Sequence, residues 1–437
     1  MKTGKDLIAL WYKPGKYFTD ALAYINEVDL DWEELVKYLD EISRDTTIQP
    51  HAKPVLYRVF ITADTLEEQL NLNSVIATME EVMKTPTVVW GTVMPDACHA
   101  GPIGTIPVWW VVVTRNAIHP GMHSADICCS VMATNFWKID PKIILDKAES
   151  ITHFWFLGRQ DTFPMNSVLD NLIKWNRFLN SKKMQEYAKY HLGTQWDGNH
   201  FLFVWVSQAT WDTYMVTHHW SRGFWAGLYK QGMEIAEKYR KELSPKTLKQ
   251  NAWIPADSQD GKDYWDALQI VRSWTKQNHL AIHNAIGLPS SEIFWNEHNF
   301  VFKDVEYYIH AKWSTPLEDK FVPDSTNGLR LIPMNMSEPV LIVRWKWFAP
   351  HWAGRNLSRT QHMKSQTKTI DEIIKEETKW LDIRFFWDPD ISELPSAYKN
   401  AQSVRSDMEK YGLGEIVDQI MPYWCIMAGN QKKPWEK

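Results

Sequence analysis

The chain contains far less glycine and far more tryptophan than expected for its length. Its 437 residues include 25 Trp and only 19 Gly, whereas an average glycine usage of about 7% would give roughly 31. Glycine is the residue that adopts positive φ and lets two backbones approach closely. Its scarcity restricts the tight turns that the chain can form, unless tryptophan stands at positions that suit glycine.

Several tryptophans lie in polar, turn-like strings, namely THHWSRGFWAG, GTQWDGNH, HAKWSTP and FAPHWAGRN. An indole is sterically hostile in such loops. We therefore hypothesise that the source organism decodes UGA as glycine and that conceptual translation wrote tryptophan instead. The hypothesis predicts positive φ, or rings that crowd the metal pocket, at several motif tryptophans. The tryptophans in motif loops are Trp110, Trp196, Trp220, Trp313 and Trp352.

A second interpretation is that the lineage is truly rich in tryptophan and packs the rings into its core. Trp253, Trp265 and Trp274 lie in ordinary or helical sequence and suit this interpretation. The codons distinguish the two, because UGG at the motif positions would exclude recoding.

The rest of the composition is that of a globular protein. Hydrophobic residues make up 44% of the chain and charged residues 23%, which favours neither disorder nor a membrane fold. The sequence lacks an apolar run of spanning length and a secretory signal, so we expect a cytoplasmic protein with no membrane partner. A net charge of −5 argues against a wholly basic surface, but RNA binding needs only a local basic patch.

The order of the expected elements indicates an α+β fold. Helical patterns cover residues 165–190, 228–243 and 262–283, and the strand-like runs FLFVWV and TYMVT lie between them. Regular βαβ alternation is absent.

The polar motifs extend from residue 94 to residue 359, so dividing the chain into independent domains would split them. We therefore predict a single catalytic domain over residues 1–437. Within it, residues 1–85 form an N-terminal edge, 86–429 the motif-bearing core and 430–437 a tail.

Five residues form a candidate metal site. Asp126 and Cys129 lie in HSADICCS, where the D-x-x-C spacing can place a carboxylate and a thiolate on one turn. His200, His218 and His298 each stand beside a strand-like run. Taken singly, each histidine suits a hydrogen-bonded core or surface role, and a buried cysteine is usually a small hydrophobe. Together they offer mixed N, O and S donors that suit one or two first-row divalent ions.

A second set of residues suits a phosphate or nucleotide site. With glycine at position 352, FAPHWAGRNLSR becomes a small-residue loop in which backbone N–H groups of Ala353, Gly354 and Arg355 can cradle a phosphate while His351 attacks it. Each basic residue taken singly also fits a solvated loop. Further cations for phosphoryl oxygens are His310, Lys312 and Arg222.

Seven strings resemble, in order, the motifs of RtcB-type RNA ligases over most of the chain. They are MPDACHAGPIGTIPV, PGMHSADICCSV, LGTQWDGNHF, THHWSRGFWAG, EHNF, HAKWSTP and APHWAGRNLSR, and several match better when Trp is replaced by Gly. The resemblance implies an α+β catalytic domain with mixed and antiparallel sheets surrounded by helices. It also implies a GTP-dependent ligase that joins RNA 3'-phosphate or 2',3'-cyclic phosphate ends to 5'-hydroxyl ends, in RNA repair or tRNA splicing.

The resemblance further implies a role for each candidate metal ligand. Two manganese ions would share the thiolate of Cys129. Asp126 and His200 would hold one ion, and His218 and His298 the other.

The remaining motif residues would handle the nucleotide and the RNA. His351 would take GMP from GTP as a phosphoramidate and pass it to the RNA 3'-phosphate, which the 5'-hydroxyl then attacks. Asn199, Lys312 and Arg222 would contact phosphates, and Asp96 would support the metal loop. The implied partners are RNA with broken ends and a translation-rescue or archease-like factor.

The chain departs from the family pattern at two positions that help to recognise guanine. Phe203 stands where the family has an acidic residue, and Ala428-Gly429 stands in place of a C-terminal Lys-Gly. These departures leave both GTP and another nucleoside triphosphate open as the nucleotide. Two other functions remain open: a metal-dependent phosphodiesterase that opens cyclic phosphates without sealing, and a protein that binds RNA ends or nucleotides without ligating.

Overall fold

The computed structural model describes residues 1–15, 17–43, 47–99, 105–154, 158–195, 199–220, 224–291, 293–323, 328–344, 347–351, 354, 359–378 and 381–429. Its helices are α1 (Gly4–Ala9), α2 (Tyr17–Glu27), α3 (Trp32–Ser43), α4 (Leu66–Val82), α5 (Pro120–His123), α6 (Pro141–Ile151), α7 (Ser167–Trp175), α8 (Lys182–Tyr190), α9 (Phe224–Leu243), α10 (Gln259–Ala285), α11 (Arg359–Ser365), α12 (Ile370–Thr378) and α13 (Ala401–Tyr411). Its strands are β1 (Tyr57–Val59), β2 (Val88–Cys98), β3 (Val108–Arg115), β4 (Ala117–Ile118), β5 (Cys129–Asn135), β6 (Phe201–Ser207), β7 (Thr213–His219), β8 (Ile254–Pro255), β9 (Ile293–Asp304), β10 (Tyr307–Lys312), β11 (Ser314–Pro316), β12 (Arg330–Ile332), β13 (Val340–Arg344), β14 (Phe348–Pro350), β15 (Asp382–Phe385) and β16 (Glu415–Met427).

One large mixed sheet organises the described part of the chain. Its order is β1-β2-β3-β10-β9-β5-β7-β6-β16-β13-β12, and β15 pairs with β16 to make twelve strands. The pairs β1–β2 and β15–β16 are parallel, and the other pairs of this sheet are antiparallel. The predicted α+β fold with mixed and antiparallel sheets is confirmed.

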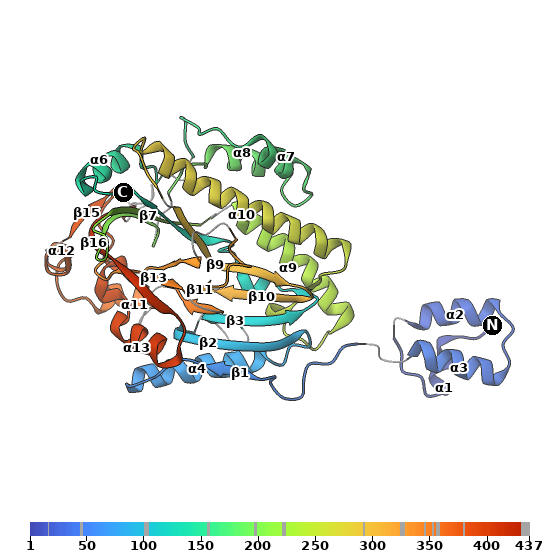
Figure 1. Ribbon diagram of the computed structural model, residues 1–437. Coiled ribbons are helices and arrows are strands. Elements are labelled where there is room, and N and C mark those ends of the chain that lie inside the picture. The colour runs from blue at the N-terminus through green and yellow to red at the C-terminus, as the bar shows by residue number, and fades with distance from the viewer. Residues whose placement is uncertain are drawn as a thin grey trace.

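Helix α10 covers one face of the central strands β5 and β7 (Figure 1). The Ser258 side chain caps its N-terminus by accepting a hydrogen bond from the Gly261 backbone N–H at 3.0 Å. Its buried residues include Tyr264, Leu268, Val271 and Thr275, which recur at the helical spacing. All residues of β5 and β7 are buried, so the residues they carry lie deep in the molecule.

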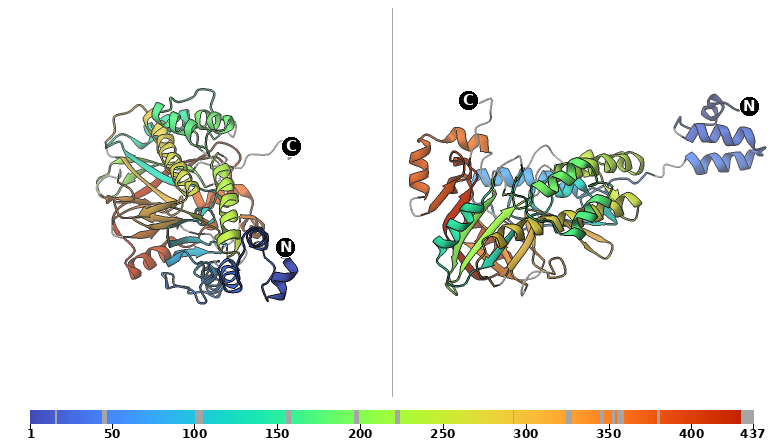
Figure 2. Two further views of the ribbon diagram at one scale, coloured as in Figure 1. Left: turned by 90° about the vertical axis from the view of Figure 1, so that its right-hand side faces the viewer. Right: turned by 90° about the horizontal axis from the view of Figure 1, so that it is seen from above.

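The first three helices form a cluster of their own. Leu7, Ala21, Ile25, Leu35 and Leu39 make up a hydrophobic cluster that includes no residue from the sheet. The three helices lie to one side of the body of the molecule in Figures 1 and 2. Helix α4, by contrast, packs on β2. Residues 1–85, predicted as one N-terminal edge, thus include both a separate helical cluster and a helix that contributes to the main core.

The helix predicted over residues 165–190 is two helices in the structure. Asn176 leaves the helical conformation with ψ 124° at the end of α7. Its side-chain oxygen then accepts a hydrogen bond from the Phe178 N–H at 2.9 Å. Such a local bond competes with the helical backbone pattern, so the chain turns before α8 begins.

Tryptophan is frequent among the described non-glycine residues with positive φ. Six of these eleven residues are Trp11, Trp109, Trp137, Trp211, Trp313 and Trp347. The prediction of positive φ is confirmed at Trp313, whereas Trp110 and Trp220 are not in this group. Trp196 and Trp352 lie outside the described residues, as does the 430–437 tail.

Within the described ranges, none of the helices combines the length and the hydropathy needed to cross a bilayer.

Candidate metal and nucleotide centre

Neighbouring strands bring the candidate ligands together. Cys129 is the first residue of β5. Strand β5 lies between β7 and β9 in the sheet, and these two strands carry His218 and His298 respectively. His200 directly precedes β6, where Phe201 pairs with His218. Because β9, β5, β7 and β6 are consecutive neighbours in the sheet, ligands that are far apart in the sequence meet at one place.

An irregularity at the start of β5 positions Cys129. The register between β5 and β9 shifts between Cys129 and Ser130, and Cys128 has φ 58°. The Cys128 N–H still donates to the Asn299 carbonyl at 2.8 Å, and the Asn299 side chain donates to the Asp126 carbonyl at 2.7 Å. A bulge of this kind commonly re-aims a side chain beside an active site.

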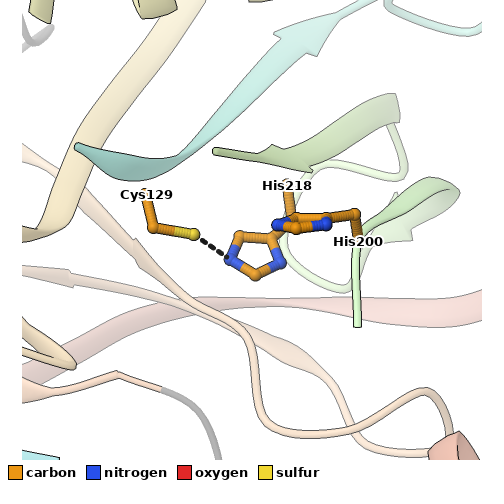
Figure 3. A group of neighbouring side chains, drawn as sticks. All are labelled: Cys129, His200 and His218. Carbon is orange, nitrogen blue, oxygen red and sulfur yellow. Dashed lines mark hydrogen bonds between the residues drawn. The ribbon is translucent and has the colours of Figure 1, made fainter. Parts of the chain in front are cut away.

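Cys129, His200 and His218 form the first group of possible ligands. One ligand atom of each lies within 4.8 Å of the other two. The Cys129 Sγ is 3.1 Å from the His218 Nε2, as the dashed line in Figure 3 shows. The His218 Nδ1 donates to the Asn199 carbonyl, 3.1 Å away, which leaves its Nε2 as the lone-pair nitrogen facing the thiol.

His218, His298 and His351 form a second group with the same spacing. The Nε2 atoms of His218 and His298 are 3.3 Å apart. The rings of His298 and His351 stack with centroids 3.5 Å apart and planes 10° apart. The His298 Nδ1 and the His351 Nε2 are buried and have no hydrogen-bond partner among the described residues. Orphaned buried nitrogens are costly unless another group binds them.

The protonation states of this cluster fit a metal ion. Burial lowers the pKa of His218 to about 4, and it lowers the pKa of His298 and His351 well below the usual range, with neighbouring histidines adding to the shift. The imidazoles are therefore neutral and offer lone pairs. Burial also raises the pKa of the Cys129 thiol well above its usual range. A bound divalent ion would displace that proton, since thiolate is the ligand form of cysteine.

Asp126 lies near this cluster but belongs to neither ligand group of the described residues. Its charge contributes to raising the pKa of Cys129 and opposes the lowering of the pKa of Lys312. The structure thus brings four of the five predicted ligands within coordinating range and places Asp126 beside them.

His351 is held at three points. Its backbone N–H donates to the Trp313 carbonyl at 3.0 Å, because β14 pairs with β11. Its carbonyl accepts from the Trp109 indole N–H at 2.7 Å. The ring Nδ1 lies 3.0 Å from the Thr315 Oγ1. If Nδ1 carries the proton and donates to Thr315, Nε2 is left with a free lone pair.

Lys312 supplies a buried cation near the same place. Its Nζ donates to the Ile106 carbonyl at 3.3 Å. Burial lowers the pKa of its ammonium group to about 8, and the nearby carboxylate of Asp126 opposes this shift. The ammonium group is therefore still charged near pH 7.

Asp96 supports a different loop from the one we expected. Its carboxylate pairs with the Lys399 Nζ at 3.1 Å, and the Lys399 backbone N–H donates to the Gly354 carbonyl at 2.7 Å. A Cβ on Gly354 would lie 2.8 Å from the Asp96 carboxylate, so glycine is required there. Burial raises the pKa of Asp96 to about 6, although Lys399 opposes the rise. Asp96 thus lies against Gly354 and pairs with Lys399.

The structure does not bring His310 to the cluster. Its Nε2 accepts a hydrogen bond from the His119 backbone N–H at 3.0 Å, and its ring packs against the His119 ring at 5.5 Å. The other predicted nucleotide and phosphate residues Arg222, Ala353 and Arg355 lie outside the described residues.

A buried polar network behind the ligands was missed by sequence reasoning. His279 on α10 lies 3.0 Å from the Ser130 Oγ and 2.7 Å from the Thr217 Oγ1. His283, one turn later, lies 2.7 Å from both Thr217 Oγ1 and Thr134 Oγ1. Ser130 follows Cys129 and Thr217 precedes His218, so α10 is tied to both ligand strands from the face opposite the cluster.

Thr315 and Lys399 were also missed, for different reasons. Thr315 lies inside HAKWSTP, so its position beside a catalytic candidate was available from the sequence. Lys399 lies in AYKNAQ, where nothing in the pattern distinguishes a buried lysine from an exposed one.

Comparison with known proteins agrees with this geometry. The family model for the tRNA-splicing ligase RtcB matches residues 170–428. A tRNA-splicing ligase RtcB of Aeropyrum pernix is 24% identical over 426 residues, covering 76% of this chain and 87% of that protein. The tRNA-splicing ligase RtcB of Methanocaldococcus jannaschii is 24% identical over 56% of this chain and 30% of its own length. That of Archaeoglobus fulgidus is 24% identical over 55% of this chain and 60% of its own length. Because the family model matches more than half of its residues, this chain belongs to the tRNA-splicing ligase RtcB family.

Proposed function

We propose that this protein is an RNA ligase that joins RNA 3'-phosphate or 2',3'-cyclic phosphate ends to 5'-hydroxyl ends in tRNA splicing or RNA repair. The observation that carries the proposal is the position of His351. Its Nε2 is buried and has no hydrogen-bond partner among the described residues. One of its two ring nitrogens lies within 4.8 Å of ligand nitrogens of His218 and His298. A neutral imidazole with a free lone pair beside a cation site is suited to attack a phosphoryl group.

Five residues would hold two manganese ions, as the family resemblance implies. They are Asp126, Cys129, His200, His218 and His298, four of which meet in the two ligand groups. When bound, the ions would supply Lewis-acid stabilisation of phosphoryl oxygens.

The chain's own residues then perform the nucleotide transfer. The Nε2 of His351 attacks the α-phosphorus of GTP, a P–N bond forms, and the P–O bond to pyrophosphate breaks. Thr315 accepts the Nδ1–H and so holds the tautomer that leaves Nε2 nucleophilic. Lys312 offers a cation to the phosphates. We place Asn199 and Arg222 on phosphates as well.

The second half of the reaction uses the activated RNA end. An oxygen of the RNA 3'-phosphate attacks the phosphorus on His351, and the P–N bond breaks to free the imidazole. The RNA 5'-hydroxyl then attacks the 3'-phosphorus, and GMP leaves with the bonding electrons. The transfers release pyrophosphate, GMP and the proton of the 5'-hydroxyl.

Recognition of guanine cannot use Phe203 in this chain. Its ring is 1% exposed and stacks between Phe201 at 3.7 Å and Trp205 at 4.8 Å in the core. Guanine preference must come from other contacts, and ATP is the competing nucleotide to test.

Substitution of His351 separates ligation from simple phosphodiester opening. We expect His351→Ala to abolish joining of a 2',3'-cyclic phosphate RNA to a 5'-hydroxyl RNA while the cyclic phosphate is still opened. His362→Ala, which changes a buried histidine outside both ligand groups, is the matched control. Both variants are made in a chain with glycine at positions 109 and 313, because the indoles there lie beside His351 and His298. A ligase unaffected by His351→Ala would refute the assignment, and opening without joining by the chain with glycine at 109 and 313 that keeps His351 would favour a phosphodiesterase.

A further inference from the structure

The six positive-φ tryptophans occupy positions where the backbone favours glycine. A side chain at φ between 52° and 73°, as these six have, brings its Cβ against the backbone. Three of the six gain little packing in return, because the exposed fractions of Trp11, Trp211 and Trp137 are 94%, 71% and 44%. Burial of the rings therefore does not account for these conformations.

The C-terminal end of helix α1, at Trp11, can be compared with that of helix α13, at Gly412. At the end of α1, the Trp11 N–H donates to the Ile8 carbonyl at 2.9 Å and the next N–H, of Tyr12, donates to the Leu7 carbonyl at 3.1 Å. Helix α13 ends with the same two bonds around Gly412, from its own N–H at 3.1 Å and from that of Leu413 at 2.8 Å. This pattern places a left-handed residue after the helix, usually glycine. Trp11 thus stands where the second helix has glycine.

Two of the six lie against the catalytic candidates. The Trp109 indole donates to the His351 carbonyl at 2.7 Å, and its ring packs on Trp313 with centroids 5.4 Å apart. The Trp313 ring lies 5.7 Å from the His298 ring. His298 and His351 are both fully buried. The two indoles therefore lie beside the histidine pair that a nucleotide would have to reach.

Other tryptophans belong to the core. Trp274 is fully buried in α10, and its indole N–H donates to the Ala188 carbonyl at 3.0 Å. Trp205 is fully buried in β6 and stacks on Phe203. Neither has positive φ. The chain thus contains both tryptophans that the fold uses and tryptophans that its backbone disfavours.

We propose that glycine occupies the six positive-φ tryptophan positions in the protein made by its native cell, where UGA encodes glycine, and that glycine at positions 109 and 313 opens the path to His351. The assignment of glycine rests on the backbone geometry, and the UGA codon is inferred from the excess of tryptophan over glycine. The second half rests on the proposed function of His351.

The codons and the native protein test the first half directly. We expect UGA at all six positions and UGG at Trp205 and Trp274, and peptides of the native protein should carry glycine at the six positions by mass spectrometry. UGG codons, or peptides containing tryptophan at the six positions, would overturn the proposal.

Stability gives a test that does not depend on function. We expect Trp211→Gly to raise the melting temperature of the chain, because it relieves a strained backbone and removes little buried surface. Trp274→Gly should lower the melting temperature, because it empties a core position. If both variants lower the melting temperature by a similar amount, the backbone conformation at Trp211 does not favour glycine.

Access to His351 is tested with a reagent instead of a substrate. Diethyl pyrocarbonate acylates neutral imidazoles that it can reach, so we expect it to modify His351 in the double variant Trp109→Gly/Trp313→Gly and not in the unsubstituted chain. Trp137→Gly is the control, since Trp137 follows β5 at the end opposite Cys129. An unmodified His351 in a folded double variant overturns the access proposal. Modified His351 without nucleotide transfer would instead refute the proposed ligase function.

Discussion

At the scale of single residues, the proposed nucleotide transfer depends on Thr315, whose Oγ1 lies 3.0 Å from the His351 Nδ1 and would select Nε2 as the attacking nitrogen. We expect Thr315→Val to slow nucleotide transfer to His351 by roughly 10- to 100-fold, the cost typical of losing a partner that orients a functional histidine. The KM for GTP should change little, because Thr315 touches the ring and not the nucleotide. Single-turnover labelling measures both quantities. Thr315→Ser keeps the hydroxyl and should keep the rate, whereas a normal rate for Thr315→Val would show that the tautomer is set elsewhere.

Cys129 is the residue whose loss should most affect metal binding. Its thiol lies in the first ligand group, and its replacement leaves two histidines that bind a divalent ion more weakly. We expect Cys129→Ala to lower the manganese content of purified protein, measured by elemental analysis. Cys425→Ala is the matched control, because Cys425 is also buried and free but lies in β16. Equal manganese in the two variants would contradict the ligand assignment.

At the scale of elements, α10 is hydrogen-bonded through His279 and His283 to β5 and β7, the strands that carry Cys129 and His218. A neutral histidine can accept one hydrogen bond and donate one. Each histidine in the network can therefore donate to the residue on one side and accept from the residue on the other. The contacts run in the order Ser130, His279, Thr217, His283 and Thr134. Burial lowers the pKa of both histidines, His283 to about 3, which keeps them neutral.

We predict that His279→Ala lowers the free energy of unfolding by about 1–3 kcal/mol, because it removes the histidine partner of the buried Ser130 hydroxyl and leaves Thr217 with His283 alone. Denaturant titration measures the change. His279→Gln retains a donor and an acceptor and should restore part of the loss. In a double-mutant cycle, His279→Ala and Ser130→Ala should show coupling of roughly 0.5–3 kcal/mol, and simple additivity would mean that the network contributes nothing.

Sequence periodicity was sufficient for some elements and failed for others. The helices predicted at 228–243 and 262–283 correspond to α9 and α10, because a long 3.6-residue pattern is a strong local signal. The split between α7 and α8 depends on one side-chain hydrogen bond of Asn176, which periodicity does not contain. Local pattern therefore predicts where long helices exist and is less reliable for where they stop.

In the candidate site, the sequence indicated the candidate ligands but not the residues that support them. The candidate ligands could be proposed from the sequence because each lies in a polar string. Cys129, His200 and His218 lie at or beside strand ends, whereas His298 lies within β9. The residues that support them could not be proposed, since their roles depend on partners far away in the sequence: His279 and Ser130 are 149 residues apart, and Lys399 and Asp96 are 303 apart.

At the scale of the whole molecule, buried neutral histidines make stability depend on pH. Burial lowers the pKa of His119 from 6.5 to about 3. Between these values the unfolded chain binds a proton that the folded chain does not, so the free energy of unfolding falls as the pH falls, by about 1.4 kcal/mol per pH unit for each such histidine. The contribution is fully present above pH 6.5. The other fully buried histidines with lowered pKa are His123, His218, His219, His279, His283, His298, His310 and His351.

We therefore predict a steep loss of stability below about pH 6.5. The free energy of unfolding, measured by urea titration at successive pH values, should fall more gradually in His119→Gln, which removes one protonation site. The Gln amide can still donate to the Asn251 carbonyl that His119 Nδ1 contacts at 3.1 Å. Identical pH profiles for the two chains would show that His119 does not titrate as its burial implies.

The most direct test of the proposed function is covalent labelling of His351. The chain with glycine at positions 109 and 313 is incubated with manganese and GTP labelled at the α-phosphate, and the labelled peptide is identified. We predict an acid-labile phosphoramidate on His351 that is absent from the His351→Gln variant. Label that persists in His351→Gln, or a manganese-loaded chain that takes no label from GTP or ATP, would contradict nucleotide transfer through this histidine.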